Sequence, residues 1–90
     1  MEGSEMWLKV QEAGAALHPN EVVVAVKTDV GSERLVVHRR SLLNGALDIG
    51  YPISERDDLY LIELPRETMS GLWRVWVPRT HVHQSQKRSA

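Results

Sequence analysis

The sequence predicts a small all-β domain, and three observations support that prediction. Runs of β-branched and other apolar residues recur along the 90 residues. Short segments rich in Gly, Pro, Asn and Asp separate these runs, as in strands joined by turns. No segment predicts a helix long enough to carry a parallel crossover. The strands are therefore expected to pair antiparallel, and about five of them fit a small antiparallel barrel or a rolled sheet.

The clearest predicted element is a hairpin in the first half of the chain. Residues 21–28 and 33–39 both contain β-branched runs, and Asp29-Val30-Gly31-Ser32 supplies turn residues between them. The stretch from Val22 to Val26 is apolar on both faces. That pattern predicts either a central strand or a strand covered by another chain.

Shorter elements flank this hairpin. Residues 6–10 predict a short strand, and residues 12–17 predict a helical turn that ends at His18-Pro19. Asn44-Gly45 is a turn signal. Residues 47–53 then alternate like a strand, but they contain Gly and Pro, which favours a bulged or edge strand over a central one.

The last part of the chain predicts a second hairpin and a tail. Residues 59–64 and 72–77 form its two strands, and residues 65–71 form the loop between them. The stretch 84–90 is polar and lacks an apolar period, so we expect a disordered tail there. The sequence thus predicts a single β domain over residues 1–83.

The final predicted strand contains two tryptophans on opposite faces. Because side chains alternate along a strand, Trp73 shares a face with Val75 and Val77, and we assign this face to the core. Trp76 shares the other face with Arg74 and needs a different cover. The N-terminal segment, a second subunit and a ligand all remain open as that cover.

Residues 71–82 resemble the closing portion of SH3-like barrels, in which a strand ends in a short Pro-containing turn before a final strand. The resemblance covers a dozen residues and implies barrel topology. It does not imply a proline-rich ligand, because the chain lacks the N-terminal Tyr-rich motif of signalling SH3 domains. Fold alone does not fix function.

Composition narrows the classes of function. The chain has no cysteine, which excludes disulfides, thiolate metal sites and cysteine nucleophiles and fits a reducing compartment. No apolar run approaches the roughly twenty residues of a membrane helix, and the acidic start differs from a signal peptide. We therefore expect a soluble, cytoplasmic protein that has no membrane partner.

The net charge of −1 argues against a protein that binds polyanions over its whole surface. Residues 1–33 carry six acids against two lysines, a net charge of −4, so the remaining residues carry +3. This asymmetry predicts that one side of the folded domain is basic.

Metal binding and catalysis find little support in the sequence. His81 and His83 would project from one face of a strand, but two ligands do not make a zinc site. A third ligand would have to come from His38, His18 or a carboxylate. The acidic stretch 54–58 lacks the pattern of a calcium loop, and no motif places a catalytic triad or a phosphate loop. The sequence predicts no metal, no cofactor and no enzyme.

Five residues form the predicted binding surface, with one tryptophan as its apolar anchor and four arginines that contact anions or carboxylates: Arg39, Arg40, Arg74, Trp76 and Arg79. The preferred interpretation is a non-catalytic protein-binding or assembly module whose partner is another protein or a second copy in a homodimer. The first alternative is single-stranded nucleic acid, with bases stacked on tryptophan and phosphates on arginine. The second is a small enzyme at a subunit interface. The alternative without a binding function is that nearby acids neutralise these arginines in ordinary surface ion pairs.

Overall fold

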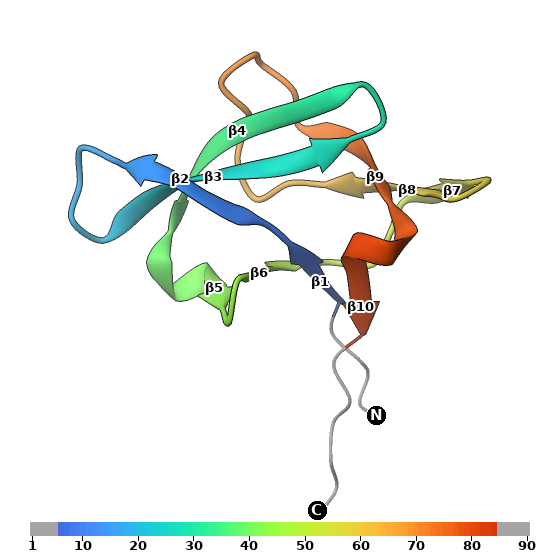
Figure 1. Cartoon of the computed structure of the whole chain (residues 1–90), viewed down its shortest axis with the longest axis horizontal. Coiled ribbons are helices and arrows are strands. Elements are labelled where there is room, and N and C mark those ends of the chain that lie inside the picture. Colours follow the sequence, from blue (N-terminus) through green and yellow to red (C-terminus); the bar gives the residue numbers. More distant parts are fainter. Residues whose placement is uncertain (1–5, 85–90) are drawn as a thin grey trace, which may run out of the picture.

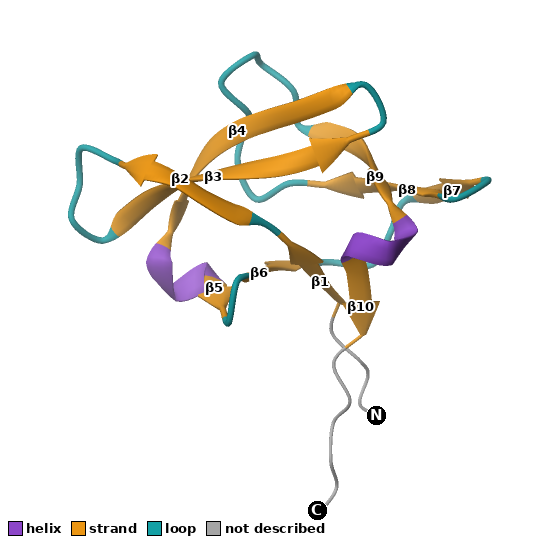
Figure 2. Cartoon of the chain, in the orientation of Figure 1, coloured by secondary structure: helices purple, strands orange, loops and turns teal. Residues whose placement is uncertain are grey.

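The structure is a computed structural model that describes residues 6–84, and within that range it confirms the all-β prediction. Figure 2 shows that the only helical elements there are two single-turn 3-10 helices. None of the described helices is long and apolar enough to cross a membrane. The elements are β1 (Met6–Lys9), β2 (Gln11–Ala15), β3 (Glu21–Thr28), β4 (Gly31–His38), η1 (Arg39–Ser41), β5 (Leu42–Leu43), β6 (Ala46–Ile49), β7 (Ser54–Arg56), β8 (Leu59–Glu63), β9 (Arg74–Pro78), η2 (Arg79–His81) and β10 (Val82–Gln84).

The described strands form three antiparallel sheets, in the orders β10-β1-β6-β5, β2-β3-β4 and β7-β8-β9. Only Val10 separates β1 from β2, so one extended segment passes from the first sheet into the second (Figure 1). The N–H of Asp29 donates to the carbonyl oxygen of Trp76 at 3.0 Å and links β3 to β9. The sheets wrap around one core, but their hydrogen bonds do not close residues 6–84 into a single barrel.

All three sheets contribute to this core. Its buried members are Leu8, Val22, Val24, Val26, Leu35, Val37, Leu47, Ile49, Ile62, Leu64, Val75 and Val77. In β3, three valines alternate inward while Val23 and Ala25 point outward and stay half-buried. The predicted hairpin is confirmed as β3 and β4, and β3 is a central strand between β2 and β4. The second predicted hairpin is confirmed as β8 and β9.

Two secondary-structure predictions are wrong: the helical turn at 12–17 and the edge position of the strand at 47–53. The expected helical turn at 12–17 is largely strand β2, because pairing with β3 satisfies its backbone groups. A bulge between Glu12 and Gly14 (φ 155°) fits the strand to the sheet. The expected edge strand at 47–53 is β6, and it lies between β1 and β5. The chain leaves this sheet at Gly50, so Tyr51 and Ile53 are exposed.

The assignment of Trp73 to the core is also wrong. A bend precedes β9, and the Trp73 side chain is 51% exposed, whereas Val75 and Val77 are buried as predicted. Thr68 from the preceding loop is buried, and its hydroxyl oxygen accepts the N–H of Leu72 at 3.0 Å. The loop, rather than the indole, closes the core at this end. Of the predicted tail, only Gln84 is described, as the last residue of β10, and residues 85–90 lie outside the described range.

Candidate binding site

The five predicted binding residues do not form one surface. Arg39 and Arg40 lie in η1, where the N–H of Arg39 donates to the carbonyl oxygen of Asn20 at 2.8 Å, just before β3 begins. The carbonyl oxygen of Trp76 accepts the N–H of Asp29, just after β3 ends. An eight-residue strand rises by about 26 Å at ~3.3 Å per residue. The two arginines of η1 are therefore separated from the Trp76 region by the length of β3.

The arginines near Trp76 already have acidic or aromatic neighbours. Arg74 lies 3.9 Å from a carboxylate oxygen of Glu63. Arg79 lies 3.8 Å from a carboxylate oxygen of Glu55 and 5.1 Å above the ring of Tyr60. These contacts are exposed and contribute little to stability, but they neutralise the charges that the predicted surface requires.

Trp76 finds its cover within the chain. The Arg56 guanidinium from β7 lies 4.3 Å from the centre of the indole, and Leu61 on β8 is the cross-strand neighbour of Trp76. This cation–π contact leaves Trp76 half-buried. None of the three covers considered from the sequence is this arginine.

The two histidines considered as metal ligands face different hollows. His81 lies in η2 and His83 in β10, so they are not alternate residues of one strand. Among residues 6–84, no group of three His, Cys, Asp or Glu side chains is placed to hold a metal ion. Each histidine belongs instead to one of two adjoining hollows.

The first hollow, which we call the cationic hollow, has a volume of about 710 Å³ and is lined by Lys9, Lys27, Arg34 and His81 among others. It lies between the junction of β1 and β2, the outward face of the β3–β4 hairpin, and η2. No acidic residue is among its described lining residues. Within residues 6–84, no carboxylate forms an ion pair with any of its two lysines or its arginine.

Strand register explains why these cations converge. Ala25 on β3 is opposite Gln11 on β2 and Arg34 on β4, so a small side chain forms the floor between two long ones. Lys27 is opposite Ser32, which makes Lys27 and Arg34 diagonal neighbours on one face of the hairpin. β3 and β4 thus place two cations on the outward side of the sheet, and β2 places the neutral Gln11 beside them.

The position of His81 at the cationic hollow lowers the pKa of its side chain. Partial burial, and then the charges of Lys9 and Lys27, lower the pKa of the His81 imidazole below its ordinary value. Both causes disfavour the protonated ring. An anion bound in the hollow would remove the second cause and favour the imidazolium.

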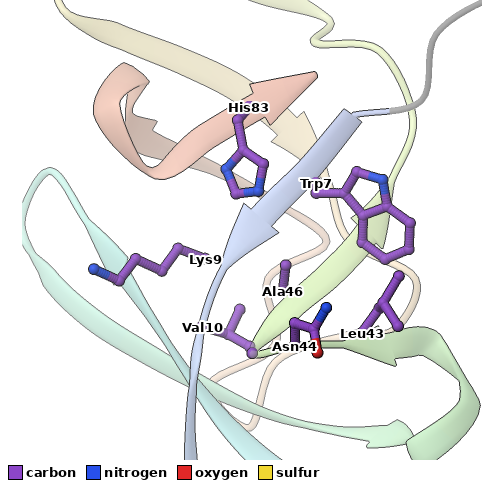
Figure 3. Close-up of a pocket in the computed structure, with 8 residues that line it drawn as sticks. Trp7, Lys9, Val10, Leu43, Asn44, Ala46 and His83 are labelled. Atoms are coloured by element: carbon purple, nitrogen blue, oxygen red, sulfur yellow. The ribbon is translucent and has the colours of Figure 1, made fainter. Parts of the chain in front are cut away.

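The second hollow, which we call the aromatic slot, has a volume of about 470 Å³ and contains Trp7, Leu43, Ala46, Asn44 and His83 in its lining. Figure 3 shows the Trp7 ring above Leu43, with the small Ala46 side chain to their left and His83 on the opposite side of the β1 ribbon. The slot combines apolar walls with polar groups at its rim.

The geometry of the aromatic slot also follows from local sequence. Ala46 on β6 is flanked in register by Lys9 on β1 and Leu43 on β5. The predicted Asn44-Gly45 turn is confirmed, with positive φ values of 53° and 80° that allow a two-residue hairpin. This turn places Asn44 at the mouth of the slot.

The two hollows adjoin, because Lys9 and Val10 line both of them. Trp7 and Lys9 project from the same face of β1, one into each end of the combined surface. We call this combined surface the β1 face. Two carboxylates are near it: Asp48 on β6 is the cross-strand neighbour of Trp7, and Glu12 lines a neighbouring hollow with Val10 and Asn44.

The sequence analysis missed most of the residues that line the β1 face. Lys27 and Arg34 could have been found, since they flank the turn of the predicted hairpin and lie close together once its strands pair. No sequence pattern brings Lys9 or His81 to the same place, because their approach depends on how three sheets pack.

Comparison with known proteins adds no relative to this picture: no family model, no curated protein and no solved structure matches the chain.

Proposed function

We propose that this protein is a non-catalytic binding module that takes a polyanionic ligand in the cationic hollow. The observation that carries the proposal is the convergence of Lys9, Lys27, Arg34 and His81 on one hollow whose described lining contains no acid. Phosphates or carboxylates spaced along a chain are the complementary chemistry. The expectation of a binding module is thereby kept, but its surface moves from the Trp76 region to the β1 face.

Three other arginines of the domain provide the contrast. Arg66, Arg74 and Arg79 each lie within 4 Å of a carboxylate, at 2.9, 3.9 and 3.8 Å respectively. A cation with such a neighbour gains less from an incoming anion. The cations of the cationic hollow repel one another in the free protein, so an anion relieves repulsion as well as adding attraction.

The binding is expected to be weak for each contact and strongly dependent on salt. Each cation that meets an anion of a charged polymer releases condensed counterions, and this gain shrinks as salt rises. The net charge of −1 disfavours binding elsewhere on the protein. A ligand is therefore expected at the cationic hollow, where cations from several described elements gather and no acid lines the surface.

The test is a titration with inorganic polyphosphate and with poly-L-glutamate, followed by NMR of the backbone amides. The proposal predicts shifts at Lys9, Lys27, Ser32 and Arg34, which line the hollow. Lys27→Glu with Arg34→Glu should abolish the shifts. Arg66→Glu with Arg74→Glu changes the net charge equally at two residues that line neither hollow and should leave most of the affinity. Equal losses in both double variants, or no binding of either polymer at low salt, would overturn the proposal.

A second candidate function, protein association, is favoured by the outward face of the sheet β7-β8-β9. Four apolar side chains there are half-buried and stand in two cross-strand pairs: Leu61 with Trp76, and Leu59 with Pro78. A protein partner or a second copy would displace Arg56 from Trp76. Light scattering over a dilution series tests for the second copy, and a monomer at all concentrations that is unchanged by Trp76→Ala would remove self-association.

A further inference from the structure

We propose that the polyanion is a single-stranded nucleic acid, bound with a base against Trp7 in the aromatic slot and with neighbouring phosphates in the cationic hollow. This inference rests on the proposed function and names its ligand class. It uses the whole β1 face, whereas the proposed function needs only the cationic hollow.

First, the two hollows lie next to each other, so a single bound chain can occupy both. Lys9 and Val10 line both, so a chain bound in one hollow reaches the other across these two residues. Trp7 and Lys9 are alternate residues of β1, and their Cα atoms are about 6.6 Å apart at ~3.3 Å per residue. That separation is on the scale of one nucleotide unit. A base on Trp7 thus brings an adjoining phosphate to Lys9.

The chemistry of the aromatic slot is the second step. Trp7 is half-buried, Leu43 is 57% exposed and Ala46 leaves space between them. A flat apolar face fits against such walls, and base–aromatic stacking tolerates any base. The amide of Asn44 both donates and accepts hydrogen bonds, so it can contact a base edge from the rim of the slot.

The placement of charge is the third step, and it favours nucleic acid over an acidic peptide. Asp48 faces the Trp7 side of the β1 face, while Lys9, Lys27 and Arg34 face the other side. A peptide rich in carboxylates would meet repulsion from Asp48. A nucleotide separates its charge from its ring, so the neutral base can lie near Asp48 and the phosphate near the cations. The carboxylate also accepts hydrogen bonds from amino groups of bases.

The requirement for a free base is the fourth step. Bases in a duplex are stacked on one another and cannot enter a slot, whereas single-stranded bases are free to stack on aromatic side chains. The other two tryptophans do not offer the same combination. Arg56 covers Trp76, and Trp73 lines neither hollow.

The experiment is fluorescence anisotropy with a labelled twelve-residue oligothymidine at low salt. Three comparison ligands accompany it: an abasic strand of the same length, a duplex and poly-L-glutamate. We expect oligothymidine to bind at least about tenfold more tightly than the abasic strand, within the loss expected for one stacked base. Trp7→Ala should lose about the same factor with oligothymidine and little with the abasic strand. Trp7→Phe should keep most of the affinity, because it retains an aromatic face.

Two controls protect this experiment from trivial loss of folding. Trp73→Ala removes an exposed indole outside both hollows and should leave the affinity unchanged. In the double variant Trp73→Phe with Trp76→Phe, Trp7 is the only tryptophan, and oligothymidine should quench its fluorescence whereas the abasic strand should not. This second measurement keeps the test valid even if Trp7→Ala unfolds.

The outcomes separate the inference from the proposed function. Equal affinity for oligothymidine and the abasic strand, with no quenching of Trp7, would overturn the nucleic-acid inference while leaving the cationic hollow as a polyanion site. Tighter binding of poly-L-glutamate than of oligothymidine would do the same. Failure of every polyanion to bind at low salt would overturn both.

Discussion

Lys27 on β3 and Arg34 on β4 are diagonal neighbours on the outward face of one hairpin. A neutral residue at either position would avoid the repulsion between these two positive charges. Like charges on neighbouring strands, within reach of each other on one face, destabilise a sheet by about a few tenths of a kcal/mol. Both residues are exposed, and no described carboxylate forms an ion pair with either of them. A local cost without local compensation is a common mark of a functional surface.

Removing one of these charges should therefore stabilise the fold and weaken ligand binding. Arg34→Gln is expected to raise the free energy of unfolding by about 0.3 kcal/mol, because it relieves repulsion from Lys27, and to weaken polyanion binding. Arg74→Gln is the matched control, since it removes an arginine that faces Glu63 at 3.9 Å and should not stabilise the domain. Urea denaturation and anisotropy titrations measure the two effects. An Arg34→Gln protein with unchanged affinity would contradict the role of this residue.

The salt dependence of binding should count the cations that meet the ligand. For single-stranded nucleic acid, the slope of log K against log salt is about −0.7 for each neutralised phosphate. Lys9→Gln should thus reduce the magnitude of the slope by about 0.7, because Lys9 lies where the two hollows meet. Arg79→Gln is the control, since Arg79 lies near Glu55 and Tyr60. Equal slopes for Lys9→Gln and the unmodified protein would place the ligand elsewhere.

Local patterns predict the strands of this fold better than they predict its sheets. The β3–β4 hairpin follows from two β-branched runs around Asp29 and Gly31, and the structure confirms it, with pairing from Glu21 and His38 to Thr28 and Gly31. The strand β2 was missed because its alanines and glycine have no strand preference, and pairing with β3 decides its conformation. The position of β6 in the middle of a sheet depends on contacts with β1 and β5, which lie far from one another in sequence.

The candidate site was harder to predict than the fold. Sequence analysis favoured arginines close to a tryptophan in the chain, but Arg74 and Arg79 have acidic neighbours that come from β8 and β7. The cationic hollow draws instead on β1, the β3–β4 hairpin and η2. Its residues are scattered in sequence, so their convergence becomes visible only when the sheets are packed.

Substitution of tryptophan should now distinguish exposed from core positions. Alternation along the predicted strand gave Trp73 a core role, and a large loss of stability would follow from that role. The exposed position that the structure gives it predicts a loss of less than about 1 kcal/mol for Trp73→Ala. Ile62→Ala on β8 is the contrast, because Ile62 is fully buried and its truncation should cost about 2 to 5 kcal/mol. If thermal or urea unfolding shows similar losses of stability for the two variants, Trp73 is part of the core and its exposed position is contradicted.

The pH dependence of stability follows from His81. Partial burial and the charges of Lys9 and Lys27 hold the pKa of His81 below its ordinary value of about 6.5. Just below that value the unfolded chain binds more protons at this residue than the folded one does. The stability that the neutral ring contributes is therefore fully present above about pH 6.5. It is lost as the pH falls from this value to the lower pKa that His81 has in the folded protein. His81→Gln should remove this part of the fall, as measured by urea denaturation at several pH values.

The pH dependence of binding should have the opposite sign. The groups that face His81 in the cationic hollow are Lys9 from β1, Lys27 from β3 and Arg34 from β4. A bound polyanion offsets their charges and raises the pKa of His81, so binding takes up a proton and tightens as pH falls from 7.5 to 5.5. His81→Gln should flatten this dependence measured by anisotropy, whereas His18→Gln, in the exposed turn before β3, should not. A dependence that persists unchanged in His81→Gln would show that the ligand does not reach η2 and would confine it to the strands.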